Sequence, residues 1–239
     1  MRKSLLWKFI YWVRDLRSKE IFEALIKYGK GEILDVGGWD FYATAKKKNI
    51  QFNSWTTLDT QEEKKLTLND KNYKFILGDG CNMPFDNNKF DTVLCIQVVE
   101  HVFEPIKMVY EVSRVLKPNC YGIFLIPQTS TIHHTPEHYY NFTRFWIMQV
   151  MKKANLEIIE LKSLGGFWST IASRLLYFFL QSIKCKGFSA EECKRNLLFY
   201  ILYPFMVLYA IINIPLCLIL SRGDLTEEPN NHYVLVKKI

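Results

Sequence analysis

The hydrophobic pattern of this chain changes character along its length. From Gly31 onward, short apolar runs alternate with stretches that show helical spacing. Runs of this length between helices are typical of buried parallel strands that helices cover on both faces. The pattern predicts strands at 33–36, 55–58, 73–77, 92–96, 121–126 and 156–161, and helices at 43–48, 104–116 and 143–154. We therefore expect a doubly wound α/β sheet, to which a strand pattern at 232–238 adds a last member.

The first residues of the chain form one apolar stripe at helical spacing. The stripe consists of Leu5, Leu6, Phe9, Val13 and Leu16. Charged residues recur within this segment and no small-residue cleavage site follows it, so it does not have the features of a signal peptide. An amphipathic helix explains the stripe, either as a lid packed on the core or as an interfacial helix on a membrane.

After residue 161 the chain becomes strongly apolar. Two apolar stretches, 167–183 and 197–220, flank a charged turn, and the second has no charged residue over a length that can cross a bilayer. Pro204 and Pro215 interrupt it. A single crossing would separate the last strand from its sheet, so we expect a re-entrant hairpin or in-plane helices bent at the prolines. The alternative is a buried helix pair in a helical subdomain.

These changes divide the chain into three parts. An N-terminal amphipathic helix covers 1–28, the α/β domain covers 29–163 together with 231–239, and a hydrophobic, membrane-associated helical insertion covers 164–230.

The net charge of +7 favours an anionic partner, either nucleic acid or a membrane surface. The basic residues gather at the N-terminus and around the C-terminal apolar stretches: Arg2, Lys3, Lys8, Arg14, Arg17, Lys19, Lys184, Lys186, Lys194, Arg195 and Arg222. This placement favours anionic lipid headgroups, and we expect no nucleic acid partner. The six cysteines form no CxxC pair and are expected to be reduced. We therefore expect a peripheral or monotopic protein on the cytoplasmic face of a membrane.

Candidate ligand-binding residues stand where predicted strands end. In GEILDVGGWD, an apolar strand ends at Asp35 and runs into a glycine turn at Gly37 and Gly38 before a helix. Such a turn brings backbone close to a ligand. The turn lacks the full GxGxxG pattern of a nicotinamide site, because Trp39 and Phe41 stand where further glycines are expected.

Two more carboxylates end the next strands in order. Asp59 follows the glycine turn by roughly twenty residues, where a carboxylate can accept hydrogen bonds from ribose hydroxyls. Asp79 ends the third strand in FILGDGCNMPF, where it can accept from an exocyclic amine of adenine. The segments FDTVLCIQVVEHVFEP and VLKPNCYGIFLIP then supply the fourth and fifth strands with their loops.

In order and spacing, these segments resemble the type 11 branch of the class I S-adenosylmethionine-dependent methyltransferases, whose members carry LDVGxGxG, GDAxxLPF, FDxVxxxxxLEH and LKPGG. The resemblance covers about 31–161 and the last strand. Trp39 and Phe41 replace two loop glycines, and Cys81 replaces an alanine. The resemblance implies a Rossmann-like sheet, parallel with one antiparallel C-terminal edge strand, and S-adenosyl-L-methionine as the cofactor.

The cofactor-binding residues follow from the same resemblance. They are Asp35, Gly37 and Gly38 for the methionine part, Asp59 for the ribose, Asp79, Gly80, Cys81 and Asn82 for the adenine side, and Gln97 near the sulfonium. Because the cofactor is a cation without phosphates, carboxylates at strand ends suit it.

A general base would help if the methyl acceptor is a hydroxyl. The candidates are His101 after the fourth strand, and His134 and His138 in TIHHTPEHYYNFT after the fifth. The alternatives are a structural role for His101 and an acceptor-binding loop without proton transfer. Relatives that bind a metal use a further carboxylate where Gln97 stands, so we predict no metal.

The acceptor itself is expected to be a small molecule or a lipid-linked compound. Type 11 relatives with such an apolar insertion resemble enzymes of cell-surface polysaccharide pathways, which implies O-methylation of a glycan or lipid-linked precursor. The alternatives are methylation of a quinone or other small apolar metabolite, and a catalytically inactive cofactor-binding protein.

Overall fold

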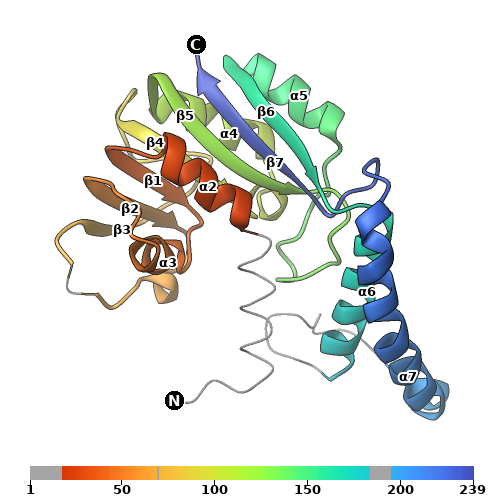
Figure 1. Ribbon diagram of the computed structural model, residues 1–239. Helices are drawn as coiled ribbons and strands as arrows, with labels where there is room; N and C mark the ends of the chain where they lie inside the picture. The colour runs from red at the N-terminus through yellow and green to blue at the C-terminus, as the bar shows by residue number, and fades with distance from the viewer. Residues whose placement is uncertain (1–17, 69, 184–194) are drawn as a thin grey trace.

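The computed structural model describes residues 18–68, 70–183 and 195–239 (Figure 1). The predicted stripe from Leu5 to Leu16 and the charged turn between the two apolar stretches lie outside these residues.

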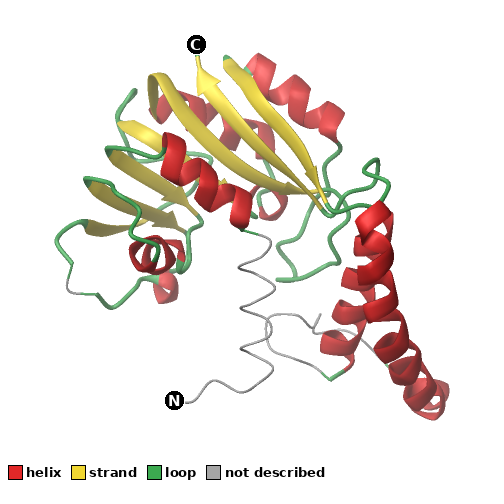
Figure 2. Ribbon diagram, in the orientation of Figure 1, coloured by secondary structure: helices red, strands yellow, loops and turns green. Residues whose placement is uncertain are grey.

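A seven-stranded sheet forms the centre of the molecule (Figure 2). The strand order is β3-β2-β1-β4-β5-β7-β6. The strands are β1 (Glu32–Val36), β2 (Ser54–Asp59), β3 (Tyr73–Leu77), β4 (Phe90–Ile96), β5 (Leu116–Pro127), β6 (Leu156–Leu164) and β7 (Asn231–Lys238). β7 runs antiparallel to both of its neighbours, and the other pairs are parallel. The predicted doubly wound α/β sheet is confirmed.

The antiparallel strand β7 lies between β5 and β6, so the outermost position that we expected for it belongs to β6. The burial of the two strands explains the order. Six consecutive residues of β7 are buried, whereas in β6 only Leu156 is buried and the other positions are half-buried or exposed. A strand that is apolar on both faces is stable inside a sheet, and a partly polar strand suits the edge.

Helices cover both faces of the sheet. On one face lie α2 (Lys19–Tyr28) and α3 (Phe41–Lys47), and on the other lie α4 (Pro105–Val115) and α5 (Arg144–Lys153) (Figure 1). Pro105 begins α4 at a position where a missing N–H costs no hydrogen bond. Thr143, where the sequence predicted a helix to begin, is the N-cap of α5, and its hydroxyl accepts a hydrogen bond from the N–H of Trp146. Short 3-10 turns lie at Glu62–Lys64 (η1), Val99–His101 (η2) and Ser221–Gly223 (η3).

The C-terminal apolar stretches form two helices that lie side by side and extend away from the sheet (Figure 1). α6 (Phe167–Ser182) follows β6, and α7 (Leu197–Leu220) leads into β7. We call this pair the helical hairpin. The buried positions are Thr170, Ala172 and Leu180 on α6 and Ala210 and Cys217 on α7. The two buried positions of α7 are seven residues apart and lie on one face, so this helix buries only a narrow face.

α7 continues as one helix through Pro204 and Pro215, where the sequence predicted an interruption. Each proline lacks the N–H that would bond to the carbonyl four residues before it. The flanking residues are strong apolar helix formers, and the helix is long enough to propagate past two missing bonds.

The base of the hairpin is fixed by Asp224, just after η3. Its carboxylate accepts hydrogen bonds from the N–H groups of Trp168 at 2.7 Å and Ser169 at 3.0 Å, and from the Ser169 hydroxyl at 2.9 Å. Glycine is required at Gly166, because a Cβ there would lie 2.1 Å from the carbonyl oxygen of Leu225. A residue beyond α7 therefore caps the first turn of α6 and holds the two chain segments together.

Candidate active site

The strand order places the predicted cofactor residues along one edge of the sheet. β1 is hydrogen-bonded to β2 on one side and to β4 on the other, and this reversal of direction marks the point where open α/β sheets bind ligands. Asp35, Asp59 and Gln97 all lie at or next to the carboxyl ends of these three strands. The fold therefore brings together residues that the sequence separates by up to about sixty positions.

The glycine turn after β1 is tightly built around Asp35. Gly37 adopts a φ of +67°, and a Cβ at this position would lie 2.4 Å from Val98 Cγ2. A Cβ on Gly38 would lie 1.9 Å from an Asp35 carboxylate oxygen. Glycine is therefore necessary at both positions, and the backbone of the turn lies directly over a buried carboxylate. This arrangement fits a cationic ligand that approaches the backbone closely.

Asp59 ends β2 and is only 5% exposed. One carboxylate oxygen accepts a hydrogen bond from the N–H of Gln61 at 2.9 Å, and the other lies 3.3 Å from Lys64 Nζ without accepting a hydrogen bond. A carboxylate at this place can accept hydrogen bonds from the two hydroxyls of a ribose. The sequence did not indicate Lys64, which η1 places beside the carboxylate.

The segment after β3 forms a closed turn. The Asp79 carboxylate accepts from the N–H of Cys81 at 2.8 Å, and Asp79 and Asn82 form an isolated bridge. The Cys81 thiol is buried and donates to the carbonyl of Glu104. Burial and the neighbouring Asp79 raise the pKa of this thiol to about 11, so it stays protonated at neutral pH. Cys81 is therefore a packing residue and not a nucleophile.

Arg114 of α4 holds the rest of this segment in place. Its guanidinium donates to the carbonyls of Met83 at 2.9 Å and Phe85 at 2.7 Å, and it pairs with Glu111 at 2.7 Å. Glu111 in turn accepts from the N–H of Met83 at 2.7 Å. The ion pair thus holds the chain directly after the predicted adenine-side residues. Arg114 and Glu111 lie on a helix and not at a strand end, so the sequence motifs did not indicate them.

Gln97 follows β4 with a φ of +55°. Its side-chain amide donates a hydrogen bond to Asn231 at 2.7 Å, and its backbone N–H donates to the carbonyl of Leu125. The side chain of Gln97 is thus hydrogen-bonded to β7, and its backbone lies directly after β4, at the carboxyl edge of the sheet.

The predicted catalytic histidines gather into one group. His101 lies at the end of η2, and residues 128–143, which we call the histidine loop, carry His133, His134 and His138. The ring centre of His101 lies 4.8 Å from that of His133, 5.6 Å from that of His134 and 5.4 Å from that of His138. The fold brings the loops after β4 and β5 together, and His133 of the same histidine-rich segment lies in the group. A catalytic role for His101, His134 and His138 stays a prediction.

These histidines are neutral at physiological pH. Burial lowers the pKa of His101 and of His133 to about 4, and it also lowers the pKa of His134 and of His138. A neutral imidazole can accept a proton or bind a metal ion. With pKa values as low as those of His101 and His133, the group is a weak base in the absence of a ligand.

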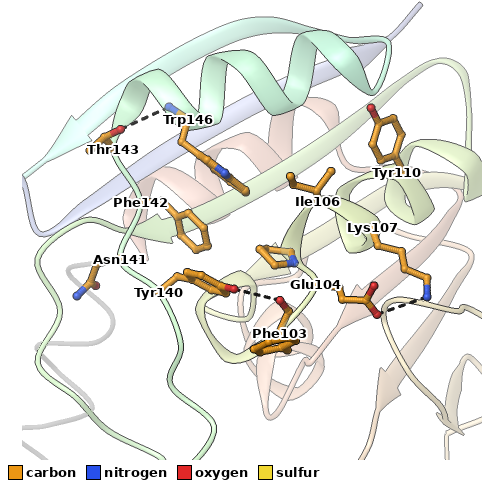
Figure 3. A pocket seen from close by; sticks show the side chains of 11 residues that line it. Phe103, Glu104, Ile106, Lys107, Tyr110, Tyr140, Asn141, Phe142, Thr143 and Trp146 are labelled. Atoms are coloured by element: carbon orange, nitrogen blue, oxygen red, sulfur yellow. Dashed lines mark hydrogen bonds and ion pairs between the residues drawn. The ribbon is translucent and has the colours of Figure 1, made fainter.

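A groove of about 830 Å³ lies beside this edge, between α4, α5 and the end of the histidine loop (Figure 3). Aromatic side chains form much of its wall: Phe103, Tyr110, Tyr140, Phe142 and Trp146. The Tyr140 hydroxyl donates to the carbonyl of Phe103 at 3.2 Å. None of the predicted cofactor residues lines the groove, so it is distinct from the carboxyl edge of β1 and β2.

The residues at the sheet edge fit S-adenosylmethionine. Buried carboxylates end β1 and β2, and a glycine turn over Asp35 leaves no room for a side chain. When bound, the cofactor supplies a methyl group on a sulfonium, which a nucleophile displaces in line. What the chain contributes is the placement of donor and acceptor, because correct positioning supplies much of the rate of such a transfer.

Comparisons with known proteins agree with this geometry. Residues 34–124 match the family model described as a methyltransferase domain. No curated protein sequence matches the chain.

One similar solved structure is a complex from Haloferax volcanii. It joins the Trm112 methyltransferase activator to a protein assigned as a methyltransferase, and the match has 13% identity and a TM-score of 0.59. The match covers 94% of this chain and 90% of the other. The 1,6-didemethyltoxoflavin-N1-methyltransferase of Burkholderia thailandensis, with its substrate and S-adenosylhomocysteine bound, shows 10% identity and a TM-score of 0.56 over 95% and 80% of the two chains.

The [4+2]-cyclase SpnF is also similar, with 14% identity and a TM-score of 0.57 over 92% and 80% of the two chains. A cyclase on this fold shows that architecture alone does not fix the reaction. The structures thus establish the fold, and the family model identifies the domain from residues that include the glycine turn and the ends of β1 to β4. Residues 34–124 form a methyltransferase domain, the chain has the fold of the class I methyltransferases, and it is an S-adenosylmethionine-dependent methyltransferase.

Proposed function

We propose that this methyltransferase works on the cytoplasmic face of a membrane, where it methylates an oxygen of a glycan or lipid-linked acceptor. The observation that carries the proposal is the exposure of α7. The helix is long and apolar enough to cross a membrane, and only 6% of its most apolar window is buried inside the molecule.

The exposed side chains of α7 are large and apolar on most of its circumference. Phe205 is 69% exposed and Ile211 is 61% exposed. Burying a side chain of this kind is worth about 1.5–3 kcal/mol, so many of them together on one helix favour a nonaqueous environment strongly. A buried helix pair in a helical subdomain would not leave this surface open.

The connections of the hairpin favour an arrangement that enters and leaves the membrane on the same side. α6 begins directly after β6 and α7 ends shortly before β7, and these two strands pair with each other. Both open ends of the hairpin therefore lie at the sheet. At 1.5 Å per residue, α7 is about 36 Å long and α6 about 24 Å, which lets the pair dip deeply into one leaflet or beyond.

A basic residue at the sheet end of the hairpin supports contact with anionic headgroups. Arg222 lies exposed in η3, directly after α7, and a second arginine, Arg174, lies exposed halfway along α6. Lysine and arginine at such positions favour the cytoplasmic leaflet. The described cysteines, Cys81, Cys95, Cys120 and Cys217, are all free thiols, which agrees with a reducing compartment.

The hairpin also contacts the histidine loop. Gln181 of α6 donates a hydrogen bond to the carbonyl of Ile132 at 3.1 Å, and the hydroxyls of Thr129 and Thr170 lie 3.1 Å apart. The rings of His133 and Tyr177 lie 6.3 Å apart. An acceptor anchored in the membrane beside α6 would therefore reach the histidines and the methyl donor together, which supports a lipid-linked substrate.

Membrane association can be tested by flotation with vesicles of phosphatidylglycerol and phosphatidylcholine. We expect the full chain to float with the vesicles, and a Leu208→Lys/Ile211→Lys variant to stay in the aqueous fraction. Each lysine near the centre of a bilayer costs about 2.5–3.5 kcal/mol.

Ile26→Lys provides the matched control, because Ile26 on α2 is 67% exposed and belongs to the α/β domain. It should float like the unchanged chain. Flotation of the double lysine variant, or failure of the unchanged chain to float, would overturn the membrane assignment.

A further inference from the structure

A group of three histidines lies where the loops after β4 and β5 meet. One ring nitrogen each of His101, His133 and His138 lies within 4.8 Å of the corresponding nitrogens of the other two, and all three residues are half-buried. His101 is more than thirty positions before the other two in the sequence, so the fold creates the group. Neither methyl transfer nor cofactor binding requires three imidazoles at one place.

We propose that His101, His133 and His138 form a binding site for a divalent transition metal ion, with Zn²⁺ as the best match. Three imidazole nitrogens and an open fourth position are the ligand set of many catalytic zinc sites. The sequence-based prediction of no metal considered a Glu-His pair with a further carboxylate at the place of Gln97, whereas this site consists of three histidines.

The hydrogen bonds around the rings leave metal-binding nitrogens available. Nδ1 of His101 lies 2.5 Å from the carbonyl oxygen of Glu137, and Nδ1 of His133 lies 2.8 Å from the carbonyl oxygen of Thr131. A carbonyl can only accept, so both Nδ1 atoms carry the proton. The lone pair of each ring is then on Nε2, which is the arrangement that backbone carbonyls impose on histidine ligands of metals.

His138 is held more loosely than the other two rings. Its Nδ1 lies 3.4 Å from the N–H of His133, and its Nε2 lies 3.4 Å from the hydroxyl of Ser130. Both contacts are at the long limit of a hydrogen bond. Little energy is therefore lost if this ring turns toward an ion.

The electrostatic surroundings favour a cation on these nitrogens. A carboxylate oxygen of Glu100 lies 3.8 Å from Nε2 of His101 and brings a negative charge to the same atom. Lys64 opposes this effect, but its ammonium group is paired with Asp59 at 3.3 Å.

Binding requires a modest contraction of the group. Zinc–nitrogen bonds of about 2.0–2.1 Å place the nitrogens of a tetrahedral site roughly 3.4 Å apart. Two of the three ligands lie in the histidine loop, which has no regular secondary structure over residues 128–143. A shift of side chains in this loop can close the remaining distance without moving the sheet.

A metal ion at this place would lie beside the acceptor. This consequence rests on the proposed function: the open coordination position would take an oxygen of the acceptor and lower its pKa, which the weakly basic histidines cannot do alone. The binding site itself does not depend on which acceptor is used.

The test is titration of the chelator-treated full chain in detergent with Zn²⁺ alone, by calorimetry, and with Co²⁺, by visible absorption. We expect one equivalent to bind, with the absorption bands of Co²⁺ in a nitrogen environment. Changes to groups that only orient ligands cost 10–100-fold, so His133→Ala and His138→Ala, which each remove a ligand, should weaken binding by about 100-fold or more.

His134→Asn is the matched control, because His134 is the neighbouring histidine of the same loop and lies outside the group. Its φ of +50° is a conformation that asparagine tolerates. This variant should bind both ions as the unchanged chain does. Titration of every variant with S-adenosylmethionine verifies that the fold is intact.

Two results would overturn the proposal. One is no saturable binding of Zn²⁺ or Co²⁺ by a chain that still binds S-adenosylmethionine. The other is unchanged affinity in both His133→Ala and His138→Ala. Metal binding is measured without acceptor and without vesicles, so failure of the membrane assignment would leave this result unaffected.

Discussion

Phe124 in β5 and Phe205 in α7 are the same residue type in two regions of one chain, and their side chains meet different surroundings. Phe124 is fully buried between the sheet and its helices, whereas Phe205 is 69% exposed. The α/β domain contains its own apolar core, and the helical hairpin turns most of its apolar surface outward. The fold therefore buries the apolar side chains of the α/β domain and leaves those of the hairpin uncovered, and the proposed membrane association rests on this contrast.

The largest expected effect comes from exchanging these two phenylalanines for alanine. Phe124→Ala should lower the free energy of unfolding of the α/β domain by about 3–5 kcal/mol, because it leaves a cavity in a closed core. Phe205→Ala should change it by less than about 0.5 kcal/mol in detergent. Denaturant unfolding of both variants measures the contrast, and equal effects would show that α7 belongs to the same core.

Acidification should lower the stability of the α/β domain and leave the helical hairpin unchanged, which is the next largest expected difference between the two regions. Burial lowers the pKa values of His101, His133 and His232 to about 4, whereas an unfolded histidine titrates near 6.5. Between these values the unfolded chain binds more protons than the folded chain, so stability is fully present above about pH 6.5 and is lost as the pH falls toward 4.

We expect the α/β domain to be about 4 kcal/mol less stable at pH 5.5 than at pH 7.5, or about 1.3 kcal/mol for each of the three histidines, measured by denaturant unfolding. The segments of α6 and α7 contain no Asp, Glu or His, so their helical signal in detergent should stay constant over this range. His232→Asn should reduce the slope of the domain. Equal stability at the two pH values would contradict the buried, neutral state of these histidines.

Asp59→Ala tests whether the carboxylate at the end of β2 contributes to cofactor binding. Loss of a carboxylate that accepts from the ribose should weaken binding of S-adenosylmethionine by about 10–100-fold, or about 1.4–2.8 kcal/mol. Lys64→Ala is the control, since it removes the ion pair but keeps the carboxylate, and it should bind nearly normally. Calorimetric titration measures both, and NADH should not bind. Full affinity in Asp59→Ala would exclude this residue from the cofactor site.

The smallest effect is expected at the joint between the two regions. Asp224→Ala removes the hydrogen bonds that cap α6 and should cost about 1 kcal/mol of stability. Burial would raise the pKa of Asp224, but hydrogen bonds from Ser169 and Trp168 outweigh burial and lower it. The contribution is therefore present above the unfolded pKa near 3.8 and is lost as the pH falls below it.

Hydrogen exchange of the amides at the start of α6 would locate the effect of Asp224→Ala. Faster exchange at Trp168 and Ser169, with no change in α4, is the expected result. Unchanged exchange at these two amides would show that the cap does not hold the hairpin to the sheet.

Much of the α/β domain followed from the sequence because its signals are local. Apolar runs of four to six residues predicted the strands, and Thr143 marked a helix start that the structure confirms. The position of β7 between β5 and β6 was not predicted, because strand order depends on pairing between distant segments. The continuity of α7 through Pro204 and Pro215 also escaped the sequence, since tolerance of a proline depends on the surrounding helix.

The site was predictable only as a set of strand ends. Asp35, Asp59 and Asp79 were identified from their places in the motifs, which the order of the sheet brings to one edge. The pairing of Lys64 with Asp59 and the hold of Arg114 on the segment after β3 come from side chains that reach across loops. The convergence of His101 with the histidine loop likewise depends on the path of two loops, which no periodicity in the sequence describes.

The most direct test of the central claim is transfer of a radiolabelled methyl group from S-adenosylmethionine by the vesicle-bound full chain to a membrane lipid extract. We expect label in the lipid fraction, loss of that label in Asp59→Ala, and strong reduction of the label in Leu208→Lys/Ile211→Lys, whose cofactor binding stays intact. Label in small apolar metabolites alone would move the acceptor to a quinone or similar compound. Binding of the donor without transfer to any fraction would contradict methylation at the membrane.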